Sequence, residues 1–81
     1  MTAEAIQEKV TAIVRDVLDC DTLVLTPDTT AAQVEDWDSL AHISIIVAIE
    51  REFGIRFELT ELKPLENVGE LWALIGAKIS R

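Results

Sequence analysis

The sequence predicts an all-α fold: a small four-helix bundle with three longer helices, one short third helix and a long loop between the first two helices. Three separate segments repeat apolar residues at helical spacing, whereas the one short apolar alternation, Ile55-Arg56-Phe57, is too brief for a sheet. The chain has 81 residues, of which 49% are hydrophobic. That is enough for one core, so we expect residues 1–81 to form a single domain.

The first helix is expected to begin after Thr2, a good N-cap residue, and to end near Asp19. Its apolar residues follow the i, i+3, i+4, i+7 pattern of one buried stripe: Ile6, Val10, Ile13, Val14, Val17 and Leu18.

Residues 20–38 lose this period and contain turn formers, including Pro27, which lacks the N–H that a helix interior uses. A loop of this length is unusual in a compact domain. We therefore expect three apolar residues to pin it onto the bundle, namely Leu23, Val24 and Leu25. Residues 30–34 are expected to form a short helical turn.

The second helix is expected from Ser39 to Phe53, with Asp38 as its N-cap and Gly54 just after its end. At ~100° per residue, its apolar residues span an arc of roughly 220°, wider than the stripe of an ordinary surface helix. These residues are Leu40, Ile43, Ile45, Ile46, Val47, Ile49 and Phe53. Either this helix is central to the bundle, or one flank faces something beyond the protein's own core. The remaining narrow face holds Ala41, Ser44, Ala48 and Arg51.

Two further helices complete the bundle. Residues 58–62 predict one short helix that closes before Pro64. The last helix is expected to begin near Asn67, with Glu70 supplying a capping-box-like pair. Its apolar stripe comprises Val68, Leu71, Trp72, Ile75 and Ile79, and Lys78 suits the negative end of its dipole.

Composition limits the partners and the compartment. Fifteen acidic residues against seven basic ones give a net charge of −8, which disfavours nucleic acid and anionic membranes and favours partners with basic patches. The single cysteine, Cys20, excludes an internal disulfide framework and suits a reducing cytoplasm. The N-terminus lacks the pattern of a signal peptide, and no apolar run is long enough to span a membrane. We expect a soluble, cytoplasmic monomer.

No catalytic or metal-binding pattern emerges. Ser39 and His42 have the spacing for a nucleophile and its base, but the sequence has no G-x-S-x-G elbow and no clear oxyanion loop. His42 is expected to be a half-exposed packing residue. The loop acids Asp19, Asp21 and Asp28 lack the glycine and terminal glutamate of a calcium-binding loop. The sequence predicts neither an enzyme nor a metal site.

Ser39 is the most informative residue. It follows the Asp38 cap, so its hydroxyl is expected at the positive end of the second helix's dipole. A phosphate ester is favoured at such a position. The sequence therefore indicates an attachment point for a phosphorylated group.

The whole chain resembles the acyl carrier proteins, a family of phosphopantetheine-binding carrier domains. The resemblance rests on Asp38-Ser39-Leu40 at the start of an apolar second helix in an acidic domain of this length. Further matching segments are Glu50 to Ile55, Phe57, Thr60-Glu61-Leu62 and Asn67-Val68. The resemblance implies that a phosphopantetheinyl transferase moves 4′-phosphopantetheine from coenzyme A onto Ser39. The thiol of this group then carries acyl groups as thioesters to partner enzymes.

The chain also departs from typical fatty-acid carriers, which place acids where Ala41, Ser44 and Arg51 stand here. The resemblance implies a carrier in fatty-acid, polyketide or other specialised acyl biosynthesis. Within that range these departures, together with Trp37 before the Asp-Ser pair, argue against general fatty-acid synthesis and favour a dedicated stand-alone carrier in a secondary or specialised acyl pathway. Two alternatives stay open. One is an aminoacyl or peptidyl carrier of a nonribosomal-type pathway, and the other is an acidic helical interaction domain that is never modified.

Two further groups of residues are expected to act on partners and cargo. Acyl-loading and acyl-transferring enzymes with basic patches are expected to dock on Glu35, Asp36, Asp38, Leu40, Ala41, Ser44, Glu58 and Glu61. An acyl chain is expected to find shelter among Ile45, Ile46, Ile49 and Leu62.

Overall fold

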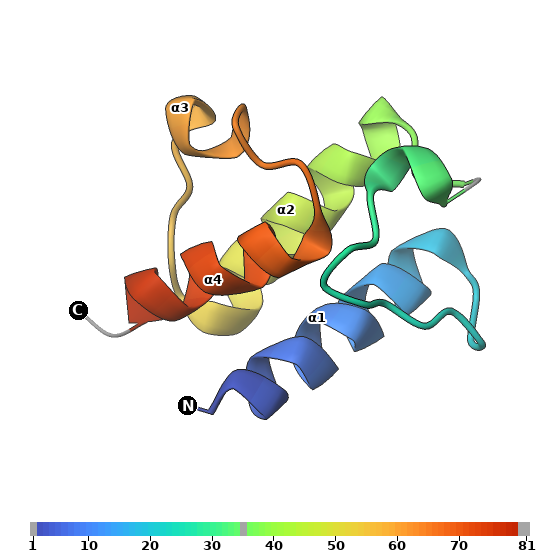
Figure 1. The fold of residues 1–81 in the computed structure, drawn as a ribbon, viewed down its shortest axis with the longest axis horizontal. Helices are drawn as coiled ribbons and strands as arrows, with labels where there is room; N and C mark the ends of the chain where they lie inside the picture. The colour runs from blue at the N-terminus through green and yellow to red at the C-terminus, as the bar shows by residue number, and fades with distance from the viewer. Residues whose placement is uncertain (1, 35, 80–81) are drawn as a thin grey trace.

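A computed structural model describes residues 2–34 and 36–79 of the protein. Within these ranges the fold is entirely helical, which confirms the predicted class (Figure 1). The elements in chain order are α1 (Ala3–Leu18), the 3₁₀ turn η1 (Ala31–Gln33), α2 (Ser39–Phe53), the short α3 (Leu59–Leu62) and α4 (Val68–Ile79). None of the described helices is both long enough and apolar enough to cross a membrane.

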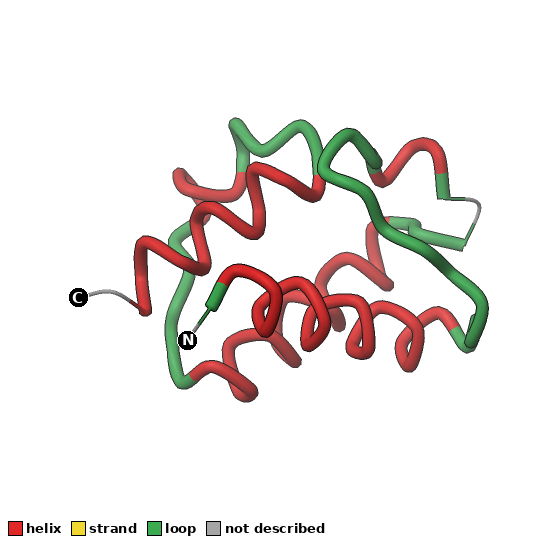
Figure 2. Tube along the Cα trace, turned by 60° about the horizontal axis from the view of Figure 1, so that its bottom comes forward, coloured by secondary structure: helices red, strands yellow, loops and turns green. Residues whose placement is uncertain are grey.

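The core lies between the three longer helices, with α1 packed against both α2 and α4 (Figure 2). Helix α1 begins and ends as predicted: the Thr2 side chain caps it, and Asp19 ends it in the left-handed region at φ 53°. Four residues of its predicted stripe are buried and two are partly buried. The buried core comprises Ile6, Val10, Val14, Leu18, Leu25, Trp37, Ile45, Ile46, Ile49, Val68, Leu71, Trp72 and Ile75.

The long loop is held by side chains and by backbone hydrogen bonds. Leu25 is buried and Leu23 is partly buried against the core, as predicted, but the prediction for Val24 is wrong because its side chain is 70% exposed. Neighbouring residues of an extended segment point in opposite directions, so Val24 turns outward where Leu25 turns inward. The Arg15 guanidinium also donates a hydrogen bond to the Leu23 carbonyl at 2.7 Å.

The same loop runs back to the start of α4 (Figure 1). The Val68 N–H donates to the Thr29 carbonyl at 2.8 Å, and the Gly69 N–H donates to the Pro27 carbonyl at 3.0 Å. A Cβ atom on Gly69 would lie 2.9 Å from the Pro27 carbonyl oxygen, so this close approach requires glycine. The loop therefore binds two of the backbone N–H groups that a helix start leaves unpaired.

Helix α2 has the predicted bounds and caps, with Gly54 in the left-handed region at φ 65°. The expectation that its wide apolar arc could all be core is wrong. Ile45, Ile46 and Ile49 are buried, whereas Leu40, Ile43 and Val47 are 74%, 60% and 41% exposed. Because the core covers only part of the arc, the alternative of a flank facing beyond the protein's own core is the correct one.

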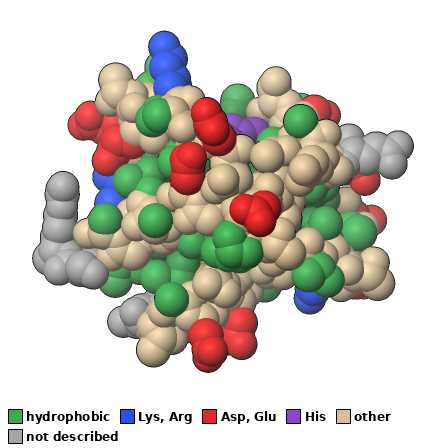
Figure 3. Space-filling model, viewed as in Figure 1, with side chains coloured by type: hydrophobic (Ala, Val, Ile, Leu, Met, Phe, Trp, Pro, Cys, Tyr) green, Lys and Arg blue, Asp and Glu red, His purple; other side chains and the backbone are tan. Residues whose placement is uncertain are grey.

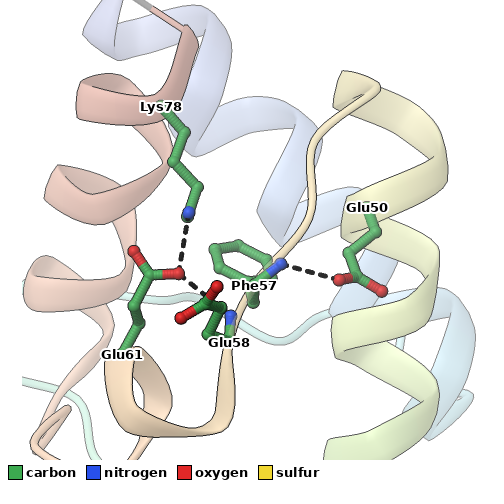
Figure 4. Close-up of polar contacts among 5 residues, drawn as sticks. All are labelled: Glu50, Phe57, Glu58, Glu61 and Lys78. Atoms are coloured by element: carbon green, nitrogen blue, oxygen red, sulfur yellow. Dashed lines mark hydrogen bonds and ion pairs between the residues drawn. The ribbon is translucent and has the colours of Figure 1, made fainter.

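A polar cluster ties α3 to the two helices beside it (Figure 4). Glu61 forms an ion pair with Lys78 of α4 at 2.7 Å and accepts a hydrogen bond from the Glu58 N–H at 2.9 Å. The Phe57 N–H donates to Glu50 of α2 at 2.8 Å, and the Lys78 ammonium lies 5.8 Å from the centre of the Phe57 ring. These contacts link the segment between α2 and α3 to the last turn of α4.

Helix α4 begins after Asn67, whose side chain accepts a hydrogen bond from the Glu70 N–H at 2.9 Å. The Glu70 carboxylate is 3.5 Å from the Glu66 N–H, one residue before the position that a capping box would use. The predicted stripe is buried except at Ile79, which is partly buried.

Candidate functional site

The candidate site is the start of α2, where Ser39 is the first helical residue. The Asp38 carboxylate accepts a hydrogen bond from the Ala41 N–H at 2.8 Å, and its carbonyl accepts one from the His42 N–H at 2.9 Å. The Ser39 side chain is exposed and forms no hydrogen bond with any residue that the structure describes. A local cap thus fixes the helix start while leaving the serine hydroxyl accessible.

The surroundings of Ser39 suit a phosphate ester. In the described residues the Leu40 N–H, in the first turn, has no acceptor. Unpaired N–H groups and the helix dipole both favour an anion at this position. The chemistry present is therefore one free hydroxyl beside a helix start that favours phosphate.

Trp37 anchors the turn that precedes this site. Its side chain is 8% exposed, and its N–H donates to the Val34 carbonyl at 3.1 Å. The Trp37 indole N–H donates to Nδ1 of His42 at 3.2 Å, with the two ring centres 6.2 Å apart. His42 is half-buried, in agreement with its predicted packing role.

This contact also bears on the nucleophile–base spacing of Ser39 and His42. Because Nδ1 accepts from the Trp37 indole, it does not accept a proton from Ser39 in this arrangement. The spacing of these two residues therefore reflects packing at a helix start. The contact between Trp37 and His42 was not predicted from the sequence.

The acids predicted for docking divide into free and engaged groups. Asp36, Asp38 and Glu58 are exposed, and acidic side chains dominate the charged groups on the face drawn in Figure 3. Glu61 is half-buried and paired with Lys78, so its charge is already compensated within the protein. Glu35 lies outside the described residues.

The remaining docking candidates lie on α2. Leu40 and Ser44 are exposed, and Ala41 is half-buried. Ile43 and Val47 were not predicted as surface residues, although the excess width of the apolar arc was a signal for them. Together these residues make the side of α2 beyond Ser39 apolar.

The predicted acyl-chain residues all belong to the core or its edge. Ile45 and Ile49 have no exposed surface, Ile46 is 7% exposed, and Leu62 is partly buried against the core.

In the described part of the chain, no three His, Cys, Asp or Glu side chains are grouped closely enough to hold a metal ion.

Comparison with known proteins identifies the family. Residues 8–75 match the model of the phosphopantetheine attachment site. The chain belongs to this family. It is 34% identical over 80 residues to an acyl carrier protein of Thermosynechococcus vestitus, with 99% of each chain covered. It is 32% identical over 73 residues to polyketide-8 synthase acyl carrier protein 2 of Streptomyces avermitilis, with 90% of this chain and 84% of the relative covered.

A solved structure supports the same conclusion. The solution structure of a holo acyl carrier protein from Geobacter metallireducens superposes with a TM-score of 0.87 and is 43% identical, covering 93% of this chain and 86% of the other. The protein is an acyl carrier protein whose cofactor is 4′-phosphopantetheine. It is a carrier and not an enzyme, in agreement with the prediction from its sequence.

Proposed function

We propose that Ser39 is the residue to which 4′-phosphopantetheine is attached. The observation that supports this assignment is the free, exposed Ser39 hydroxyl at the start of α2, behind the Asp38 cap. In the proposed reaction, the Ser39 oxygen forms a bond to the β-phosphorus of coenzyme A as the bond to adenosine 3′,5′-bisphosphate breaks. The transferase supplies the metal ion and the base that takes the serine proton.

The carrier's own residues position the attachment point. Asp38 fixes the first turn, Trp37 holds the preceding turn in the core, and the free Leu40 N–H faces no competing acceptor in the described structure. When attached, the arm supplies a thiol to which an acyl group is bound as a thioester.

We further propose that the cargo is an acyl intermediate of fatty-acid, polyketide or other specialised biosynthesis. The names of the relatives support an acyl cargo and include both general and polyketide carriers. The single free cysteine, Cys20, is compatible with a carrier that acts in the reducing cytoplasm. The exposed acids Asp36, Asp38 and Glu58 are proposed to attract basic partners, and Ile45, Ile46, Ile49 and Leu62 to line the space that admits an acyl chain.

The attachment is tested by intact-mass spectrometry after incubation with coenzyme A and a broad-specificity phosphopantetheinyl transferase. The unaltered chain is expected to gain one phosphopantetheine group, and Ser39→Ala is expected to gain none while keeping its helical circular dichroism. Thr60→Ala is the matched control and is expected to be modified normally, because Thr60 is also exposed but lies on α3, outside the proposed docking residues. Modification of Ser39→Ala would refute the assignment.

The acyl-chain proposal is tested by NMR with a medium-length acyl chain on the arm. Amide shifts are expected to change at Ile45, Ile46, Ile49 and Leu62 as well as around Ser39. Changes confined to the neighbourhood of Ser39 would show that the chain stays outside the bundle.

A further inference from the structure

Helix α2 carries an exposed apolar row that the protein itself does not cover. Leu40, Ile43 and Val47 are spaced by three and four residues, so they lie on one side of the helix. Arg51 follows Val47 by four residues and continues the same row. The row therefore begins next to Ser39 and ends at a cation.

This row borders an open groove between α1 and α2. The groove has a volume of about 650 Å³ and is lined by Ile13 of α1 and by Ile43, Ser44, Val47, Ala48, Arg51 and Glu52 of α2. Glu52 forms an ion pair with Lys9 of α1 at 3.8 Å. The groove is therefore mainly apolar, and its uncompensated charge is that of Arg51.

The far end of α2 is basic although the whole protein is strongly acidic. A second hollow, of about 560 Å³, is lined by two arginines and one acid, together with three uncharged residues: Arg51, Arg56, Glu50, Val47, Gly54 and Ile55. Both arginine side chains are exposed, and neither has an ion-pair partner in the described structure.

Of the two acids nearest to these arginines, Glu52 is paired with Lys9. Glu50 accepts the Phe57 N–H and keeps its charge, so among the described residues two cations face one unpaired carboxylate at this end of α2. Asp36 and Asp38, at the opposite end of α2, are exposed acids. The docking side of α2 thus has an acidic end, an apolar middle and a basic end.

We propose that α2 binds a partner helix of matching polarity. That helix places an apolar ridge in the groove between α1 and α2, basic residues over Asp36 and Asp38, and acidic residues over Arg51 and Arg56. This proposal rests on the carrier function proposed above and specifies the surface that a partner enzyme presents. Arg51 lies 13 positions after Asp38, which corresponds to ~20 Å along the helix and sets the separation of the partner's two charged ends.

The arrangement of charge gives docking a direction. A partner that is basic along its whole length would place cations against Arg51 and Arg56, and like charges facing each other select against such a partner. A bipolar partner is favoured in one orientation only. In that orientation, the end of α2 that carries Ser39 lies against the basic end of the partner.

Three synthetic helical peptides with the same apolar ridge test the proposal. One carries Lys at one end and Glu at the other, the second carries Lys at both ends, and the third carries Glu at both ends. The bipolar peptide is expected to bind the protein tightest, by roughly threefold to tenfold over the all-Lys peptide. A spin label at its Lys end is expected to broaden amide signals around residues 36–38 and not those around residues 51–56.

Two charge-reversed variants provide the matched comparison. Arg51→Glu is expected to remove the preference for the bipolar peptide and to make the all-Lys peptide the tightest. Lys63→Glu changes the net charge equally but lies outside both hollows, so it is expected to leave the ranking unchanged. All-Lys binding as tight as bipolar binding in the unaltered protein, or no peptide binding at α2 at millimolar concentration, would overturn the proposal.

The peptide experiment uses the protein without phosphopantetheine, and modification is measured separately by mass. A lost ranking with normal modification would overturn the docking proposal alone. Absent modification with the expected ranking would instead overturn the assignment of Ser39.

Discussion

Helices α2 and α4 are both rich in apolar residues, but the protein covers them to different degrees. Helix α4 buries Val68, Leu71, Trp72 and Ile75 and exposes the small side chains Ala73 and Ala77. Helix α2 buries three isoleucines and exposes Leu40, Ile43 and Val47. Exposed large apolar side chains at helical spacing are typical of a surface that other molecules contact.

The ends of the two helices also differ in how far other parts of the protein bind them. Loop carbonyls bind the first N–H groups of α4, and Glu61 pairs with Lys78 in its last turn. Among the described residues, the start of α2 has only the Asp38 cap, and the arginines at its far end have no ion-pair partner. The protein thus binds both ends of α4 internally and leaves those of α2 exposed, which is consistent with the docking proposed at α2.

The largest loss of stability is expected from substitutions of core residues in the two helices. Ile49→Ala in α2 and Ile75→Ala in α4 each remove a side chain with no exposed surface. We expect each to lower the free energy of unfolding by about 2–5 kcal/mol, because each leaves a cavity. Urea unfolding measures the loss. A small effect of Ile49→Ala alone would show that α2 is less firmly packed than α4.

The covered start of α4 is tested by two glycine substitutions. Gly69→Ala places a Cβ 2.9 Å from the Pro27 carbonyl oxygen, so the loop must move. We expect a loss of about 1–3 kcal/mol from such overpacking. The control is Gly76→Ala, whose Cβ would meet Ile6 at an ordinary 3.7 Å. That variant is expected to gain up to about 1 kcal/mol from helix propensity, and equal effects would argue against a tight α4 start.

The covered end of α4 is tested through the ion pair of Lys78 and Glu61, whose side chains are 14% and 30% exposed. We expect Lys78→Met to lower the free energy of unfolding by about 1 kcal/mol, less so at high salt. Lys9→Met is the comparison, because its pair with Glu52 is longer and more exposed. A double-mutant cycle with Glu61→Gln isolates the pair, and no coupling would mean that α3 is held by its other contacts.

The smallest effect on stability is expected on the open side of α2. Ile43→Ser and Val47→Ser are expected to change the free energy of unfolding by less than about 0.5 kcal/mol. Both are expected to weaken binding of the bipolar peptide, because the apolar ridge loses its contact. A large loss of stability in the same urea measurement would place these residues in the core and remove the contrast between α2 and α4.

The helix bounds were predicted well from capping residues and residues that end helices. The Asp38 cap, the Gly54 end and the Ser39 position follow from residues adjacent in the chain, which is why sequence alone located the candidate attachment residue. The division of the α2 arc was not predictable in the same way. It depends on where α1 and α4 pack, and that position is set by contacts distant in sequence.

The pairings of polar groups show the same limit. From the sequence, Lys78 was expected to interact with its helix dipole and Glu61 with partners, whereas the structure joins the two in an ion pair. The long loop was expected to be held by apolar side chains, and it is also attached by backbone hydrogen bonds to α4. Such pairings require the folded chain, because their partners come from separate elements.

The three longer helix starts offer a modifying enzyme very different targets. At α1 the Thr2 hydroxyl is engaged by the Ala5 N–H at 3.2 Å, and at α4 the loop closes the end. Only at α2, among these described starts, is a hydroxyl free. On the proposed assignment, this free hydroxyl distinguishes Ser39 from Thr2, and it depends on the folded start of α2. The attached group would then mark chains in which the start of α2 has folded.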